Sequence, residues 1–106
     1  AYSEADFGKF VSWQCKDYVH EASTVVEVGY FSKDGLTNIG FVLYDGGNSG
    51  ALTQYQREGL NHRWDWGPGN TYSFIIKPDG IGLYYDFSSV PAGEKTKAND
   101  VYKCAR

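Results

Sequence analysis

The chain has 106 residues, which is enough for one hydrophobic core, so we expect a single domain over residues 1–106. Hydrophobic residues make up 42% of the sequence and aromatic residues 17%, which excludes intrinsic disorder. The net charge of −3 argues against nucleic acid or an anionic membrane surface as a partner, because either requires a cationic face. No apolar run approaches the roughly 18–20 residues that span a bilayer, so no membrane insertion of the mature chain is expected.

The N-terminal segment is compatible with two elements. Residues 3–6 resemble a helix N-cap followed by acidic first-turn residues, after which Phe7, Phe10 and Val11 fall on one helical face. A short N-terminal helix is therefore one prediction, and an edge strand over residues 9–14 is the other. A chain that starts at Ala1, with no basic or apolar leader, also fits cleavage by signal peptidase and export to the periplasm or the medium.

From Thr24 onward the apolar residues repeat every second position, as in half-buried strands. Val26, Val28 and Tyr30 form one such series, and after a turn at residues 33–35 a second series leads through residues 39–43. Residues 45–50 are rich in Gly, Asn and Ser, which predicts an exposed loop.

The second half of the chain continues the same pattern of short strands and turns. We expect strands over residues 51–56, 60–66, 71–77, 81–87 and 101–104, with turns at 68–70 and 78–80 and a long surface loop over 88–100. Seven or eight short strands without a βαβ alternation predict an all-β fold, an antiparallel barrel or sandwich.

Two cysteines lie near opposite ends of the chain, outside any CxxC pair and without a histidine at metal-binding spacing. They are either two buried thiols or one structural disulfide between Cys15 and Cys104. The disulfide is favoured, because closing a loop of about 90 residues stabilises a fold by up to about 4–5 kcal/mol in the chain-entropy model. A disulfide would agree with an oxidising compartment.

Motifs of catalysis and of cofactor binding are missing from the sequence. It contains no G-x-S-x-G elbow, phosphate-binding Gly loop, H-E-x-x-H or dinucleotide fingerprint. His20 and His62 have no obvious cysteine or serine partner in the sequence, and Asp65 and Asp86 resemble the solvated positions of alternating strands. We therefore expect a binding protein that is not an enzyme and uses no metal or cofactor.

The densest aromatic segment covers residues 61–67 and includes His62, Arg63, Trp64 and Trp66. If it is a strand, His62 and both tryptophans share one face and Arg63 lies on the other. One interpretation makes the tryptophans core residues. The other makes an exposed aromatic side chain such as Trp64 an anchor at a protein interface.

Three short motifs follow one another in an order that resembles the bacterial c-type lysozyme inhibitors. They are Trp-Gln-Cys-Lys at residues 13–16, Asn-Ser-Gly-Ala at 48–51 and the aromatic strand with its turn at 74–80. The resemblance implies a small antiparallel β-barrel with a structural disulfide. It also implies a protein partner, a c-type lysozyme, whose two catalytic carboxylates are engaged by a serine hydroxyl and a basic side chain.

Carried over to this chain, the inhibitory Ser-Gly-x-x-Tyr motif begins at Ser49 and Gly50. Thr53 stands where the family has its tyrosine, and the nearest tyrosine is Tyr55. Either Arg63 or Lys77 would be the basic contact. An acidic inhibitor would also complement the positive charge of such lysozymes.

Two other binding functions remain open from the sequence. One is a calycin-like carrier of a small apolar ligand, and the other is a glycan-binding module that stacks sugars on Trp64, Trp66 and a tyrosine. The many large aromatic residues predict an interior filled by side chains. A cavity larger than about 300 Å³ would instead favour the carrier.

Overall fold

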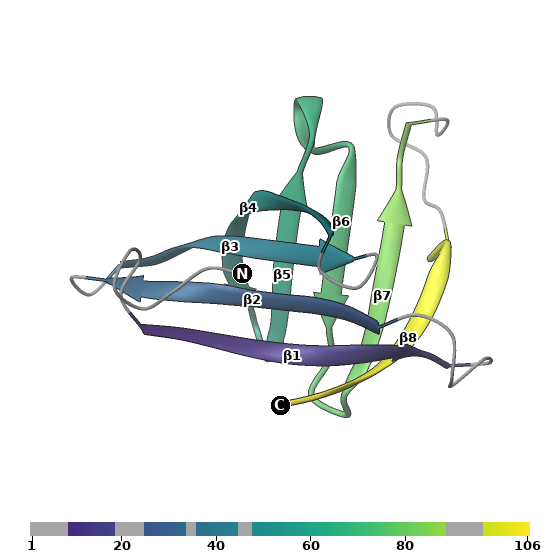
Figure 1. Ribbon diagram of the computed structural model, residues 1–106. Coiled ribbons are helices and arrows are strands. Elements are labelled where there is room, and N and C mark those ends of the chain that lie inside the picture. The colour runs from purple at the N-terminus through teal and green to yellow at the C-terminus, as the bar shows by residue number, and fades with distance from the viewer. Residues whose placement is uncertain (1–8, 19–24, 34–35, 45–47, 89–96) are drawn as a thin grey trace.

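Eight strands follow one another along the chain and close into an antiparallel barrel (Figure 1). The computed structural model describes residues 9–18, 25–33, 36–44, 48–88 and 97–106. The strands are β1 (Lys9–Asp17), β2 (Val25–Lys33), β3 (Leu36–Tyr44), β4 (Ser49–Glu58), β5 (Asn61–Trp66), β6 (Tyr72–Ile76), β7 (Ile81–Asp86) and β8 (Asp100–Ala105), with a short 3-10 turn, η2 (Pro68–Asn70), between β5 and β6. Each strand pairs with the next in sequence, and β8 pairs with β1. The predicted all-β antiparallel fold is confirmed.

The barrel consists of two groups of strands that cross at a steep angle. In Figure 1, β1, β2 and β3 run across the view, whereas β5, β6 and β7 run steeply relative to them. The curved strand β4 connects the two groups. Coiling of this kind allows a sheet of eight strands to meet its own edge, and β1 and β8 close the barrel by pairing from Gln14 with Ala105 to Asp17 with Tyr102.

The seam where the chain closes on itself carries the disulfide. Cys15 of β1 lies directly opposite Cys104 of β8 in the antiparallel register, and the two are bonded across 89 residues of sequence. The predicted bridge is confirmed. It joins the first strand of the barrel to the last.

Alternation along each strand decides which residues fill the barrel. Trp64 of β5 and Phe74 of β6 are opposite each other and fully buried, and their neighbours in sequence point outward. The inward-facing core consists of Trp13, Cys15, Val26, Val28, Val42, Tyr55, Trp64, Phe74 and Ile76. This interior positions the site described below.

A second set of buried rings lies on the outer face of the sheet. Phe31 and Phe41 pack with ring centroids 5.2 Å apart, and both are at least 96% buried. Gly29 permits this approach, because a Cβ there would lie 2.6 Å from the Phe41 ring. In β3, therefore, Val42 faces the interior while Phe41 is buried on the other side.

The ends of some predicted elements differ in the structure. The N-terminal prediction of a strand over residues 9–14 is correct, because these residues belong to β1. The part of the alternative helix before residue 9 lies outside the described residues. Ser49 and Gly50, predicted to be in a loop, begin β4, while most of that loop lies outside the described residues. Within the described ranges, no helix is long and apolar enough to cross a membrane.

Candidate ligand-binding site

One half of the barrel interior is not filled by side chains. It contains a cavity of about 480 Å³. The lining residues come from six strands and are Val26, Val42, Tyr44, Trp66, Tyr72, Phe74, Tyr84, Asp86 and Tyr102. The prediction of an interior filled by side chains is therefore wrong, because the aromatic rings of this part line a space instead of closing it.

The cavity lies toward the barrel end where four strand termini meet. β3 ends at Tyr44, β5 ends at Trp66, β6 begins at Tyr72 and β7 ends at Asp86. Tyr72 and Asp86 are direct partners in the register of β6 and β7. We call this end, defined by Tyr44, Trp66, Tyr72 and Asp86, the cavity end. Apolar side chains of Val42 and Phe74 lie deeper and are almost completely buried.

Three aromatic rings form one wall of the cavity. The Trp66 ring centroid lies 5.8 Å from that of Tyr72 and 6.2 Å from that of Tyr84. Burial is the main cause of the raised pKa of Tyr84, and the nearby Asp86 carboxylate raises it further. Burial is likewise the main cause of the raised pKa of Tyr102, and the negative charges of Asp100 and Asp17 raise it further. These phenols therefore keep their protons at neutral pH and can donate hydrogen bonds to a ligand.

Asp86 is the one charged side chain among the lining residues that the structure describes. Hydrogen bonds from the side chain and the backbone of Ser88 lower the pKa of Asp86. The Ser88 backbone N–H donates to the Asp86 carboxylate over 2.9 Å. The Asp86 backbone N–H donates in turn to the side-chain oxygen of Asn99, also over 2.9 Å. The carboxylate is therefore ionised at neutral pH and held at the cavity end.

The other half of the interior is occupied by aromatic rings. We call this part the packed half and define it by the side chains of Trp13, Tyr30, Tyr55 and His62. Tyr30 and Tyr55 stack with centroids 4.3 Å apart, and Trp13 lies 4.6 Å from His62. The Tyr55 hydroxyl lies 2.6 Å from Nδ1 of His62. Burial raises the pKa of Tyr55 to about 12, so this phenol retains its proton and can donate it to Nδ1.

Burial is also the main reason that the pKa of His62 is lowered, and the positive charges of Arg57 and Arg106 add to the effect. His62 is therefore neutral at physiological pH, and its Nδ1 can then accept a hydrogen bond from the Tyr55 hydroxyl. This hydrogen bond satisfies polar groups inside the packed half. His62 therefore has a structural role, because its hydrogen bond with Tyr55 gives a polar side chain of the interior a partner.

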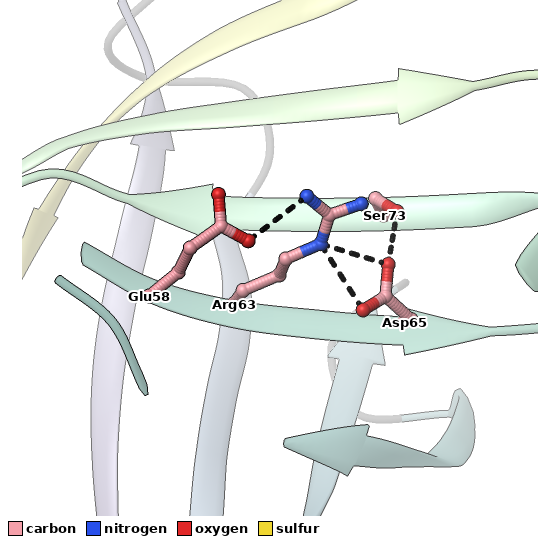
Figure 2. A network of polar contacts seen from close by, with 4 residues as sticks. All are labelled: Glu58, Arg63, Asp65 and Ser73. Carbon is pink, nitrogen blue, oxygen red and sulfur yellow. Dashed lines mark hydrogen bonds and ion pairs between the residues drawn. The ribbon is translucent and has the colours of Figure 1, made fainter. Parts of the chain in front are cut away.

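On the outer face of β5 and β6, a polar network surrounds Asp65 (Figure 2). The Arg63 guanidinium donates from Nε to both carboxylate oxygens of Asp65 over 3.1 Å and from Nη1 to Glu58 over 3.2 Å. The Ser73 hydroxyl donates to the same Asp65 carboxylate. Asp65 and Ser73 are 6% and 1% exposed, so the carboxylate depends on these partners.

The structure separates the residues predicted to contact a partner. Ser49 and Gly50 are exposed at the start of β4, where Ser49 lies opposite Tyr44 at the cavity end. Lys77 directly follows β6, whose other terminus lies at the cavity end. Its Nζ lies 3.9 Å from Asp79 in the β6–β7 turn. Ser49 and Lys77 therefore do not converge on one end of the barrel.

Three other predicted contact residues have structural roles. Trp64 is completely buried and Tyr55 is 6% exposed, so neither ring is available to a partner at the surface. Arg63 is tied to Asp65 and Glu58. The prediction of an exposed Trp64 anchor is wrong, because its strand turns this ring toward the barrel interior, where it excludes water from the core.

The residues that line the cavity were only partly recognisable from the sequence. Trp66 was predicted to share a face with Trp64, but alternation left open whether that face points into the core or toward a partner. Asp86 resembled a solvated position, because a single strand does not reveal which rings its neighbours place beside it. Tyr84 and Tyr102 come from β7 and β8, whose pairing was not predicted.

Comparison with known proteins finds no family model, no curated protein and no solved structure that matches this chain. The functional argument below therefore depends on the geometry of the barrel itself.

Proposed function

We propose that the protein is a small-molecule-binding barrel that holds a compact ligand with an apolar or aromatic body in its cavity. The cavity of about 480 Å³ is the observation that carries this proposal. Its volume lies within the range of about 300–1,000 Å³ that is typical of small-ligand sites. The mixture of buried apolar side chains with a few polar groups is also typical of such sites.

Each part of the lining has a role in this proposal. Val42 and Phe74 provide apolar surface that favours burial of a ligand's hydrocarbon part. Trp66 and Tyr84 provide flat ring surfaces for stacking. The protein acts by binding and release, and it works in the periplasm or outside the cell, a location with which the Cys15–Cys104 disulfide agrees.

A neutral fluorescent probe tests the proposal. N-phenyl-1-naphthylamine is expected to bind saturably with one site per chain and to brighten on leaving water. Val42→Phe should weaken this binding about tenfold or more, because the larger side chain occupies space in the cavity. Val101→Phe is the matched control, since Val101 is 38% exposed on β8 and does not line the cavity.

Titrations of the wild type and both variants are compared with their thermal unfolding midpoints. Absence of saturable binding to the wild type, or equal weakening by the two substitutions, would contradict the proposal. If Val42→Phe fails to fold, Trp66→Ala replaces it, because this change removes a wall of the cavity without adding volume.

A second candidate function is inhibition of a c-type lysozyme, and the exposure of Ser49 and Gly50 at the cavity end favours it. In this proposal the Ser49 hydroxyl enters the enzyme's cleft and hydrogen-bonds to a catalytic carboxylate. Arg63 is held by Asp65 and is the register partner of Gln56, and Lys77 follows the opposite end of β6, so Ser49 acts in this candidate without either of them.

A lysozyme turbidity assay tests this second candidate. Ser49→Ala is expected to weaken inhibition by about tenfold, the usual effect of losing one charge-assisted hydrogen bond. Ser32→Ala is the matched control, because Ser32 is exposed on β2, away from the cavity end. If micromolar wild-type protein does not slow the enzyme, this candidate is rejected.

A further inference from the structure

The electrostatic character of the cavity distinguishes between classes of ligand. Among the described residues that line it, none is a lysine or arginine, and Asp86 contributes a negative charge. Ser88 and Asn99 hold the Asp86 segment through hydrogen bonds of 2.9 Å, so the carboxylate is positioned before any ligand arrives. A preorganised charge costs less to use in binding than one that must first be ordered.

Two further carboxylates lie close to the phenols of the cavity. Asp100 of β8 is the register partner of Tyr84, and Asp17 of β1 is the register partner of Tyr102. Both carboxylates act electrostatically on Tyr102, where they add to the effect of burial in raising its pKa. Asp86, Asp100 and Asp17 therefore lie next to residues that line the cavity or line it themselves.

Two lysines of the strands at the seam, β1 and β8, lie on the opposite face of the sheet. Lys16 and Lys103 are register partners in β1 and β8, one position away from the inward-facing Cys15 and Cys104. Both lysines are exposed, and Nζ of Lys103 lies 4.9 Å from the ring centroid of Tyr18. The alternation of the strands thus separates these positive charges from the cavity.

Aromatic rings complement the carboxylate. The ring centroid of Trp66 lies 5.8 Å from that of Tyr72 and 6.2 Å from that of Tyr84, and all three rings line the cavity with Asp86. The faces of such rings carry negative electrostatic potential, and they attract ammonium groups, including quaternary ones that cannot donate hydrogen bonds. A hydrated metal ion would leave most of a cavity of about 480 Å³ unused.

We infer that the cavity selects an organic cation, in which an ammonium group contacts Asp86 and the rings of Trp66, Tyr72 and Tyr84 while an apolar body occupies the space beside Val42 and Phe74. This inference rests on the proposed function, that the cavity is a ligand-binding site. It adds the sign of the charge and the arrangement of the ligand, whose cationic group lies at the cavity end and whose apolar part lies deeper.

Two probes of the same shape test the inference. Benzyltrimethylammonium and neopentylbenzene differ in one central atom, nitrogen or carbon, and therefore in charge. Each is used to displace N-phenyl-1-naphthylamine from the protein. The cation is expected to bind at least about tenfold more tightly, because it gains the attraction of the rings and of Asp86. Benzenesulfonate, an anion, should not displace the dye.

Asp86→Asn should remove most of the preference for the cation while leaving the affinity for neopentylbenzene within about twofold. Asparagine retains an acceptor oxygen for the Ser88 N–H, so the local fold is preserved. Asp79→Asn is the matched control, because Asp79 is an exposed carboxylate in the β6–β7 turn and does not line the cavity. It should leave the preference for the cation intact.

The possible outcomes separate this inference from the proposal beneath it. Equal affinity for the two isosteric probes, tighter binding of benzenesulfonate, or a cation preference that survives Asp86→Asn would overturn the inference and leave the ligand-binding barrel in place. Failure of the dye and of all three probes to bind the wild type would reject both.

Discussion

Replacing Cys15 and Cys104 together by alanine is expected to lower the free energy of unfolding by about 4–5 kcal/mol in the chain-entropy model. The bridge spans 89 residues, so its loss releases almost the whole unfolded chain from a closed loop. It also lies at the seam between β1 and β8, the pairing in the described barrel that joins strands distant in sequence. A domain of this size is usually stable by only about 5–15 kcal/mol, so the loss is a large part of the total.

Urea denaturation of the oxidised wild type, the reduced wild type and the double alanine variant measures this effect. The reduced protein retains the cysteine side chains, so its difference from the alanine variant reports the change in packed volume alone. A loss of less than about 1 kcal/mol on reduction would show that strand pairing holds the seam without the bond.

Trp64→Ala is expected to cost about 3–5 kcal/mol, the usual range for deleting a buried tryptophan. The side chain is completely buried, and its indole N–H donates to the carbonyl oxygen of Gly29 over 2.7 Å. It therefore links β5 to β2 across the interior. Gly40 of β3 makes room for it, since a Cβ there would lie 2.5 Å from the indole ring.

Trp66→Ala is the matched comparison, two residues further along the same face of β5. Trp66 is half-buried and lines the cavity, so its removal enlarges a space that already exists. We expect a loss of stability below about 2 kcal/mol together with loss of dye binding. Equal destabilisation by the two changes in urea denaturation would contradict the assignment of Trp64 to the core and Trp66 to the binding site.

These two tryptophans belong to two parts of the barrel, one that stabilises the fold and one that lines the proposed binding site. The packed half and Trp64 provide buried area and hydrogen bonds that stabilise the fold. The cavity end leaves apolar surface without packing partners from the protein, at a cost in dispersion energy that a bound ligand would recover. A ligand that fills the cavity should therefore raise the unfolding temperature, because it binds the folded state alone.

Much of the barrel could be predicted from local patterns. Period-two alternation located the strands through Val26, Val28 and Tyr30 and through Tyr72 and Phe74, because a strand turns successive side chains to opposite faces. Gly-rich turn signals located the connections, as at Gly80, where φ is +88°. The same patterns left the N-terminal segment open between a helix and a strand, since its apolar residues suit either period.

Alternation did not decide which face of a strand points inward. Phe41 and Val42 of β3 are both buried, on opposite sides of the sheet, so the apolar pattern of this strand has no unique direction. Trp64 was open to two interpretations for the same reason. Burial is a property of the closed sheet, in which eight strands together determine where the interior lies.

Strand period, turn chemistry and cysteine position are local or compositional signals, so the antiparallel β fold could be predicted from them and a bond between the two cysteines favoured. Three features became known only from the folded barrel: Ser49 and Lys77 do not meet, Arg63 pairs with Asp65, and a cavity lies beside Asp86. Free volume depends on the summed size of side chains from six strands, and the register that brings them together is set only when the barrel closes.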